Sequence, residues 1–354
     1  MKVYRYEKNP IITPNDIKAH REDFEVIGVF NPGVAKYKDD IILLLRVAER
    51  PKNKDTNIYK VPIVNTKTGK LDIIEINVNN DRYDFSDNRV IKKNIRNDVS
   101  TKYLTSISYI IIARSKNGKD FTIDEKPFIY PSDDYDCFGV EDPRITQIGE
   151  WYYVYFSVVS PKGVGVRLIR TRDFETIENC GIIFSPENKD VLIFPEKING
   201  KYYALHRPVP KSIGHPEIWI AESENLQYWG KHRFLLGLRE NMWDNGRIGG
   251  GVVPFKTKYG WVELYHGASK DDRYCMGAVL LDLNDPSKVI ARTEMPILEP
   301  IEEYEVNGFF GGVVFACGSL VENDVVKIYY GVADTSVAYA EININEILNK
   351  LVYF

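Results

Sequence analysis

The amino-acid sequence predicts an all-β fold, a five-bladed β-propeller with a short C-terminal helix. Helical periodicity is scarce in its 354 residues, whereas short β-branched and aromatic runs are broken repeatedly by Gly, Asn, Asp and Pro. A two-part unit of strands and turns also recurs five times in the same order. Such repetition is typical of propellers, in which each repeat forms one four-stranded sheet around a central channel.

Both parts of the repeat can be followed along the chain. The first part has a small or Pro-containing entry, a strand, a polar turn and a second strand, as in NPGVAKYKDDIILLLRVAE, EDPRITQIGEWYYVYFSVV, FPEKINGKYYALHRP, GGGVVPFKTKYGWVELYHG and GGVVFACGSLVENDVVKIYYGVAD. The second part is a strand followed by a turn, as in IIIARSKNGKDF, VRLIRTRDFETI, IWIAESENLQYW, AVLLDLNDPSKV and VAYAEININEI. A β-sandwich is the alternative, but it gives no reason for both parts to recur in one order.

We expect one catalytic domain over residues 1–354, with an insertion in the first blade at about residues 50–105. The insertion separates the two parts of the first repeat and contains a hairpin of its own, IYKVPIV-NTKTGK-LDIIEINV. At the other end of the chain, NINEILNKLVYF is the clearest helix, with Asn343 or Asn345 as its N-cap.

Composition and charge narrow the class of protein. Hydrophobic residues make up 44% of the chain and charged residues 27%, which suits a large folded core. The net charge of −4 argues against non-specific nucleic-acid binding, which requires a strongly basic surface. The N-terminus lacks the apolar core of a secretory signal, no apolar run is long enough to cross a membrane, and the four cysteines show no CxxC spacing. We therefore predict a cytoplasmic protein that binds neither nucleic acid nor membrane.

The entry residues of each repeat are expected to meet at one end of the central channel. The innermost strand of each blade lines this channel, so its entry and the end of the next strand point toward one pocket. The polar residues at these places are Asn31, Arg46, Glu49, Glu141, Asp142, Arg144, Lys189, Asp190, His206, Arg207, Arg247, Tyr265, His266 and Asp334. So many charged groups at one channel mouth are unusual for a purely structural surface.

Basic residues on neighbouring blades predict an anion site, formed by Lys189, Arg207, Arg247 and His266. Arginine and lysine side chains both suit phosphate, and glycines 249–251 let backbone N–H groups approach an anion. The alternative is that each basic group only pairs with an acid at a blade seam, which is the better account of any one of them alone. Four at adjacent blade positions favour a phosphate pocket.

Asp142 is the candidate catalytic acid because it stands at the channel mouth, in GVEDPRI. An Asp before Pro is otherwise common in turns. Inverting glycoside cleavage needs an acid for the leaving oxygen, and hydrolysis also needs a second carboxylate to activate water. Phosphate already carries charge and needs only a basic cradle, so one acid with a basic pocket favours phosphorolysis. The 23 tyrosines and five tryptophans suit sugar binding, although most are expected in the core.

Over nearly its whole length the sequence resembles glycoside hydrolase family 130, the mannoside phosphorylases. The matching segments occur in order as FNPGVA, LLLRVAER, LTSISYIIIARS, GVEDPRI, TRDFET, NKDVLIFPEKINGKYYALHRP, IWIAESENLQYWG, GRIGGG, GWVELYHG, GAVLLDLNDPSKVI and YYGVADT. The resemblance implies a five-bladed propeller with Asp142 as the general acid, acting through the 3-hydroxyl of the mannosyl unit. It implies as phosphate ligands Lys189, Arg207, Arg247 and His266.

The resemblance also implies a mannosyl site made of Asn31, Arg46, Asp142 and Asp334. The pocket pattern adds Glu141 and Tyr265 as substrate-binding residues. Some family members have Arg-Asn where this chain has Lys189-Asp190, and Lys where it has Arg247. The charge is kept at both basic positions, whereas Asp190 replaces an amide. Hydrolytic members lack this basic set, so its presence supports phosphorolysis.

The implied reaction is inverting phosphorolysis of a β-mannoside by inorganic phosphate, giving α-D-mannose 1-phosphate and a shortened sugar without metal or organic cofactor. The segments LTSISYIIIARS and GVEDPRI point to β-1,2-mannobiose or β-1,2-mannooligosaccharides as substrate. The alternatives are a β-1,4-mannooligosaccharide phosphorylase, an inverting β-mannosidase with Glu49 or another carboxylate as base, and a non-catalytic sugar-binding propeller. Members of the family often form homo-oligomers, so a homo-oligomer is expected here.

Overall fold

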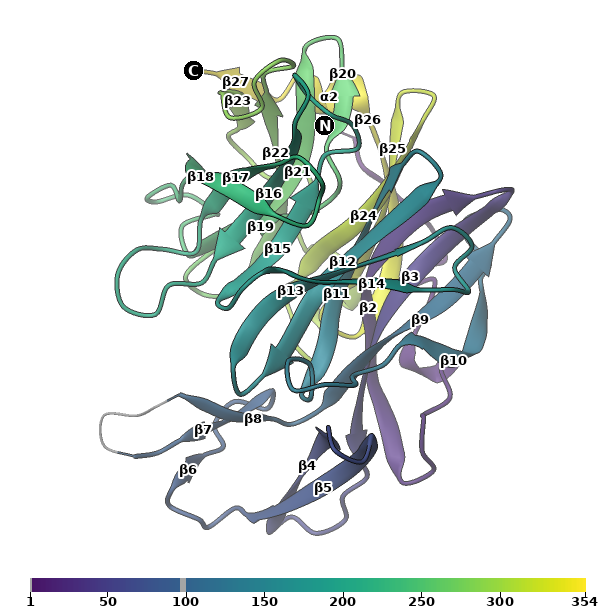
Figure 1. Cartoon of the computed structure of the whole chain (residues 1–354), viewed down its shortest axis with the longest axis vertical. Helices are drawn as coiled ribbons and strands as arrows, with labels where there is room; N and C mark the ends of the chain where they lie inside the picture. The colour runs from purple at the N-terminus through teal and green to yellow at the C-terminus, as the bar shows by residue number, and fades with distance from the viewer. Residues whose placement is uncertain (1, 96–99) are drawn as a thin grey trace.

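A computed structural model describes residues 2–95 and 100–354, and strands dominate this part of the chain (Figure 1). The helical segments described are short: η1 (Pro14–Asp16), α1 (Glu303–Val306) and α2 (Ile344–Leu348). None of the helices described is long and apolar enough to cross a membrane. The prediction of an all-β fold is therefore confirmed.

Five larger sheets follow one another along the chain, and their neighbouring strands pair antiparallel. The first sheet contains β2 (Phe24–Tyr37), β3 (Asp40–Pro51), β9 (Ile107–Ser115) and β10 (Thr122–Ile129). The second contains β11 (Gly139–Ile148), β12 (Trp151–Ser160), β13 (Gly163–Thr171) and β14 (Glu178–Phe184). The third contains β15 (Asn188–Ile193), β16 (Tyr202–Pro208), β17 (Ile218–Ser223) and β18 (Trp229–Leu236).

The two ends of the chain join the last two sheets. The fourth sheet contains β19 (Arg247–Gly250), β20 (Phe255–Thr257), β21 (Gly260–Ala268), β22 (Tyr274–Leu281), β23 (Val289–Thr293) and the C-terminal β27 (Leu351–Tyr353). The fifth contains β24 (Val314–Glu322), β25 (Val325–Val332), β26 (Ser336–Asn343) and the N-terminal β1 (Tyr4–Arg5). The fourth sheet exceeds four strands because β20 pairs with β21 and β27 pairs with β23.

Neighbouring larger sheets share cores of buried apolar side chains. Four clusters join consecutive sheets, represented by Leu44 with Val154, Leu168 with Ile193, Leu205 with Val279, and Leu264 with Val314. A fifth cluster contains Leu45 of the first sheet and Tyr339 of the fifth. The series of shared cores therefore returns from the last sheet to the first, and burial of these apolar surfaces stabilises every junction.

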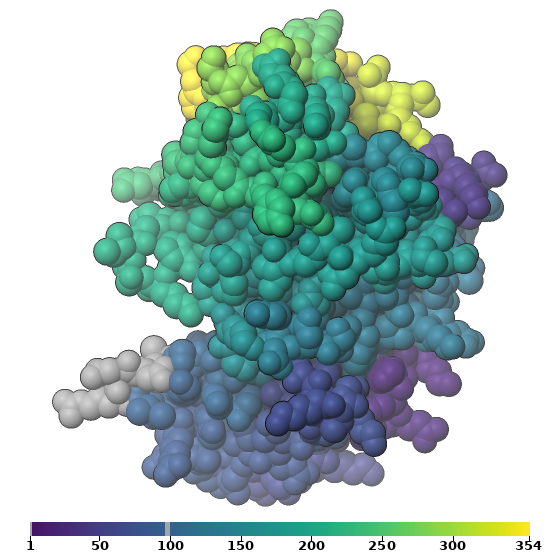
Figure 2. All heavy atoms as spheres, viewed as in Figure 1, coloured from purple at the N-terminus to yellow at the C-terminus, as the bar shows by residue number. Residues whose placement is uncertain are grey.

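Two small sheets lie between β3 and β9, within the span expected for the insertion. They are the hairpin of β4 (Ile58–Asn65) with β5 (Lys70–Asn77), and the sheet of β6 (Tyr83–Asp84), β7 (Val90–Lys93) and β8 (Thr101–Leu104). Figures 1 and 2 show them as a blue lobe below the larger sheets. The predicted hairpin is present, while residues 96–99 of the expected insertion lie outside the described part of the chain.

The C-terminal helix is shorter than the segment NINEILNKLVYF suggested. The side chain of Asn343 accepts a hydrogen bond from the Asn345 N–H at 2.9 Å, so Asn343 is the N-cap of α2. The helix ends at Leu348, and the last residues form β27 because Leu351 is buried against the fourth sheet. The prediction of a short terminal helix is confirmed, but Leu351–Tyr353 form a strand where the helix was expected to continue.

Candidate active site

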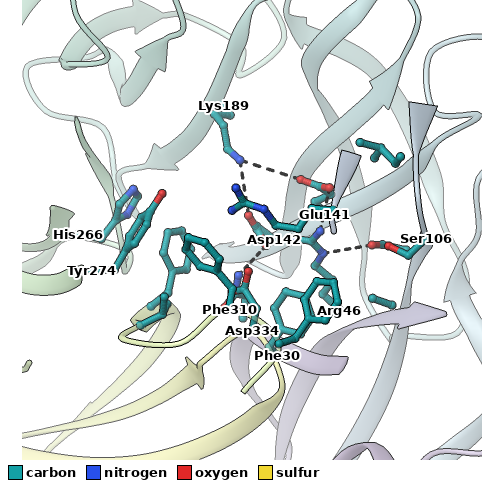
Figure 3. Close-up of a pocket in the computed structure, with 18 of the residues that line it drawn as sticks. Phe30, Arg46, Ser106, Glu141, Asp142, Lys189, His266, Tyr274, Phe310 and Asp334 are labelled. Carbon is teal, nitrogen blue, oxygen red and sulfur yellow. Dashed lines mark hydrogen bonds and ion pairs between the residues drawn. The ribbon is translucent and has the colours of Figure 1, made fainter. Parts of the chain in front are cut away.

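A cavity of about 320 Å³ collects side chains from all five larger sheets and from the insertion (Figure 3). Its wall includes the predicted residues Asn31, Arg46, Glu141, Asp142, Lys189, Asp190, Arg207, Arg247, His266 and Asp334. These residues come from strands and strand-connecting turns far apart in sequence, so the repeat correctly indicated which strand ends meet. The cavity therefore has the composition expected of a site for a polar, charged ligand.

Three of these residues stand at β-bulges in the first strands of their sheets. Register shifts follow Phe30 in β2, Glu141 in β11 and Lys189 in β15. The next residues, Asn31, Asp142 and Asp190, have φ angles of +50°, +50° and +53°. Asn and Asp adopt this left-handed conformation more readily than most residues, and a bulge re-aims a side chain. The recurring bulge thus turns one polar side chain from each of these three sheets toward the cavity.

The acidic side of the cavity centres on Asp142. Asn31 Nδ2 and Arg46 Nη1 each donate a hydrogen bond to Asp142 Oδ1 at 2.9 Å. Arg46 Nη2 also donates to Glu141 Oε1 at 2.8 Å. Burial opposes ionisation of Asp142, but Arg46, Lys189 and Asn31 outweigh burial and hold its pKa below the ordinary value. Asp142 is therefore a carboxylate in this environment.

Lys189 links the acidic side to the basic side. Its Nζ lies 3.9 Å from Asp142 Oδ2 and 4.0 Å from Glu141 Oε2 (Figure 3). Burial opposes its charge, but the acids around it raise its pKa, so Lys189 stays protonated.

Across the cavity, burial raises the pKa of Asp334 to about 6 although Arg46 opposes this. The pKa of Asp334 is therefore raised while that of Asp142 is lowered, so Asp334 binds a proton more readily than Asp142.

The basic side is formed by Arg207, Arg247 and His266. Arg207 Nε and His266 Nε2 lie 3.1 Å and 3.2 Å from Asp190 Oδ2. Arg247 Nη1 donates to Tyr274 Oη at 2.9 Å. Burial lowers the pKa of His266 despite the neighbouring Asp190, so His266 offers a ring N–H rather than the positive charge that the sequence suggested. Arg207 and His266 pair with Asp190 and Arg247 pairs with Asp272, as the alternative proposed, and the three basic groups also share one cavity.

Tyr265 does not line the cavity, in contrast to its predicted substrate-binding role. Its hydroxyl donates to Asp244 at 2.9 Å and accepts from Arg292 Nε at 3.0 Å, and its ring stacks on Trp243. Neighbouring residues of a strand point to opposite faces, so Tyr265 must face away from the cavity that His266 enters. The sequence pattern named both residues at this strand end, and of the two only His266 lines the cavity.

Glu49 and His206 also face partners outside the cavity wall. Glu49 accepts hydrogen bonds from Tyr109 Oη at 2.5 Å and from the His20 N–H at 2.8 Å. Burial raises its pKa, and only 1% of the residue is exposed. His206 bonds to His232 at 3.0 Å. Glu49 is therefore poorly placed to activate a water molecule in the cavity, which weakens the mannosidase alternative.

Several cavity residues were missed by the sequence argument, namely Arg89, Ser106, Ser108, Tyr274, Phe309, Phe310 and Phe315. Arg89 belongs to the insertion, and its guanidinium lies 4.1 Å from the centre of the Phe310 ring. The repeat says nothing of how an insertion folds back, so no signal pointed to Arg89. Tyr274 is the first residue of β22, and it pairs with Ala268 at the end of β21. Its position beside that strand end could have predicted that it reaches the cavity.

Comparisons with known proteins agree with this geometry. The model of glycoside hydrolase family 130, described as β-1,4-mannooligosaccharide phosphorylase, matches residues 99–352. The chain is 57% identical over 351 residues to a β-1,2-mannobiose phosphorylase of Listeria innocua serovar 6a, with 99% of each chain covered. It is 39% identical over 249 residues to a 1,2-β-oligomannan phosphorylase of Thermoanaerobacter sp. strain X514, covering 70% of this chain and 81% of the relative.

The fold agrees as well. The structure superposes on the β-1,2-mannobiose phosphorylase of Listeria innocua in its complex with β-1,2-mannobiose, with a TM-score of 0.97, 56% identity and 99% of each chain covered. The family match extends over most of the sequence, and the similarity to this relative is full-length in both sequence and structure. The chain therefore belongs to glycoside hydrolase family 130.

Proposed function

We propose that this chain is an inverting phosphorylase that acts on β-1,2-mannobiose or short β-1,2-mannooligosaccharides. The observation that carries the proposal is one cavity in which Asp142 lies opposite the basic groups of the third and fourth sheets. The 57% identity to a β-1,2-mannobiose phosphorylase supports the choice of linkage. The products would be α-D-mannose 1-phosphate and a sugar shortened by one mannosyl unit.

In the proposed reaction, inorganic phosphate binds among Lys189, Arg207, Arg247 and His266. One phosphate oxygen forms a bond to the anomeric carbon from the face opposite the leaving sugar, and the glycosidic C–O bond breaks. The leaving oxygen takes the proton of the mannosyl 3-hydroxyl, which takes a proton from Asp142 in turn. Attack on the opposite face inverts the anomeric configuration. The chemistry requires phosphate as co-substrate and calls on no metal or organic cofactor.

The charge balance around Asp142 suggests how this acid would acquire its proton. Arg46 and Lys189 hold its pKa low in the structure described. A phosphate dianion beside Lys189 would offset part of that positive charge and raise the pKa of Asp142. Phosphate would then supply the nucleophile and also favour the protonated acid.

The mannosyl unit is proposed to bind on the acidic side, against Asn31, Arg46, Glu141 and Asp334. Arg46 offers its guanidinium as donor, and the carboxyl groups offer acceptors for sugar hydroxyls. The Arg46 guanidinium also lies 4.7 Å from the centre of the Phe30 ring, which fixes its plane. This arrangement supports an oriented sugar whose 3-hydroxyl reaches Asp142.

We also propose that residues 1–354 form one five-bladed propeller, with the insertion in its first blade. The support is the series of five shared cores, which leads from each larger sheet to the next and back to the first. We further propose a cytoplasmic homo-oligomer. The four free cysteines fit a reducing compartment, and size-exclusion chromatography with light scattering would test the assembly.

Product analysis tests the function. The protein is incubated with β-1,2-mannobiose, with and without inorganic phosphate, and the anomeric products are followed by NMR. The expected result is α-D-mannose 1-phosphate that forms only with phosphate. Free mannose released at equal rates without phosphate would show a hydrolase and contradict the proposal.

A β-1,4-mannooligosaccharide phosphorylase is the second candidate, favoured by the description of the matching family model. The same assay with β-1,4-mannobiose separates the two linkages, because the ratio of kcat/KM values reports which acceptor geometry the cavity binds in the transition state. We expect the β-1,2-linked sugar to be preferred. Binding of either sugar without turnover would support the non-catalytic alternative.

A further inference from the structure

Asp190 is a buried carboxylate that the proposed reaction does not use. Its side chain is fully buried, yet three basic side chains of three other strands surround it. Arg207 Nε of β16 and His266 Nε2 of β21 lie 3.1 Å and 3.2 Å from Oδ2. Arg144 Nη2 of β11 lies 3.5 Å from Oδ1. One carboxylate thus touches side chains of the second, third and fourth sheets.

The charge of Asp190 makes it unsuited to bind an anion itself. Burial opposes its ionisation, but Arg207 and His266 outweigh burial and hold its pKa well below the ordinary value. An ionised carboxylate in contact with phosphate would repel it. Asp190 must therefore influence an anion through the basic groups that it touches.

Those basic groups need a counter-ion. Removing water from a guanidinium costs several kcal/mol, and an unpaired buried cation is strongly destabilising. Arg144 and Arg207 are both nearly buried, with side chains 2% and 8% exposed. Arg144 also donates to the backbone carbonyls of Gly250 and Gly251. Arg207, in contrast, would lose its buried acid partner without Asp190. With Asp190 present, Arg207 can remain in place before any anion arrives.

The backbone is also built for this contact. Asp190 has a φ of +53° at the bulge of β15, which directs its side chain toward the fourth sheet. On that sheet Gly249 faces it. A Cβ on Gly249 would lie 2.5 Å from Asp190 Oδ2 and 2.7 Å from His266 Nε2. The contact between Asp190 and His266 therefore requires a residue without a side chain at position 249.

We propose that Asp190 is a positioning residue for phosphate binding, which holds Arg207 and His266 in the orientation that receives the anion without touching the anion itself. The inference rests on the proposed function, since that function names inorganic phosphate as the ligand of these two groups. In the described residues, neither Asp190 oxygen makes an aligned hydrogen bond, so the basic groups keep donor capacity for an incoming anion.

The substitution Asp190→Asn gives opposite results under the two simplest views of this residue. If Asp190 only adds negative charge to an anion site, its removal should tighten phosphate binding. If it positions Arg207 and His266, its removal should weaken phosphate binding. Asn keeps the size and accepts a positive φ, so the bulge should fold normally.

The matched control is Asp244→Asn. Asp244 is also fully buried and ion-paired with two arginines, Arg239 and Arg292, but it lies outside the cavity wall. Direct titration of inorganic phosphate by calorimetry gives its Kd for wild type and both variants. Steady-state kinetics gives KM for phosphate and for β-1,2-mannobiose separately. Circular dichroism confirms that each variant is folded.

We expect Asp190→Asn to raise Kd and KM for phosphate about tenfold, the lower end of losses seen when a partner of a ligating side chain is removed. KM for the sugar and the phosphate Kd of Asp244→Asn should change less than twofold.

A phosphate Kd that is unchanged or lower in Asp190→Asn overturns the inference, even if the enzyme is a phosphorylase. If wild type binds phosphate but cleaves no mannoside, the proposed function fails while the Kd comparison still decides the role of Asp190. No phosphate binding by wild type overturns both.

Discussion

Adjacent residues of β21 reach two buried carboxylates that are held in different ways. Tyr265 contacts Asp244, which also receives Arg239 Nη2 at 2.7 Å and Arg292 Nη2 at 2.6 Å. His266 contacts Asp190, whose basic neighbours lie between 3.1 Å and 3.5 Å away. The Asp244 cluster is saturated by short hydrogen bonds, whereas the Asp190 cluster keeps donors that are not fully used.

This difference separates a structural ion cluster from a functional one. Short, aligned charge-assisted bonds leave no donor for a ligand, and they fix the packing of the fourth sheet. The longer contacts at the cavity wall leave N–H groups of Arg207 and His266 that can donate hydrogen bonds to a bound anion. The sequence alone does not distinguish these clusters, because both are acids among arginines. The following changes test how far the distinction holds.

The largest effect is expected at the acid of the cavity. Asp142→Asn keeps the size of the side chain and its left-handed backbone, but it cannot donate the proton that the leaving sugar needs. We expect kcat to fall by about 10²–10⁴-fold. The free energy of unfolding should fall as well, because Arg46 loses one of its two carboxylate partners. Single-turnover kinetics and denaturant unfolding measure the two quantities. A folded variant that retains more than a tenth of the activity would remove Asp142 from the chemical step.

The next effect is on stability and concerns the saturated cluster. Asp244→Asn leaves Arg239 and Arg292 buried with a neutral partner, so we expect the free energy of unfolding to fall by about 3 kcal/mol. Urea unfolding at neutral pH measures the loss. Catalysis by the fraction that stays folded should be preserved. Loss of phosphate affinity in this variant would show that the two clusters are coupled through β21.

A third buried carboxyl, Glu263, sharpens the comparison because it forms no ion pair within residues 2–95 and 100–354. It accepts one hydrogen bond, from the Gly251 N–H at 3.1 Å, and burial raises its pKa to about 8 from 4.5. Between these two values the folded protein holds a proton that the unfolded chain has released. Stability should therefore fall as pH rises through this window, by up to about 1.4 kcal/mol per pH unit.

Glu263→Gln removes the titrating group and keeps the shape, so its unfolding free energy should vary less between pH 5 and 8 than that of wild type. The variant should match wild type best at low pH and exceed it near pH 8. Urea unfolding at several pH values gives both curves. Parallel curves for the two proteins would mean that Glu263 is ionised in the fold.

The sequence predicted which strand ends meet at the cavity better than it predicted to which side of a strand each residue points. Asp142, Lys189 and Arg207 were placed in one pocket because the repeat specifies where each strand begins and ends. Tyr265 and His266 were both named at one strand end, but neighbouring residues of a strand point to opposite faces, so only one of the two can enter the cavity. The face of β21 that enters the cavity is set by packing against Trp243 and Asp244, residues outside the repeat.

Contacts between sheets were beyond the sequence for a similar reason. Asp190 was recognised as an acid among basic residues, but its simultaneous approach to Arg144, Arg207 and His266 depends on the spacing of three sheets. That spacing is set by the volumes packed in the shared cores. The insertion is harder still, because Arg89 enters the cavity from the turn before β7, in a segment that follows no repeat.

The smallest effect is expected from one added methyl group between the two sides of the Asp190 cluster. The Cβ of Gly249→Ala would lie within 2.7 Å of both Asp190 Oδ2 and His266 Nε2, so these groups must move apart. We expect KM for phosphate to rise by roughly threefold, less than removal of an ion partner would cause, with KM for the sugar little changed. The control is Gly230→Ala in β18, where an added Cβ has no neighbour within 4 Å. If Gly249→Ala leaves KM for phosphate at the wild-type value, the spacing of Asp190 and His266 is looser than a positioning role requires, and the contrast with the rigid Asp244 cluster loses its functional meaning.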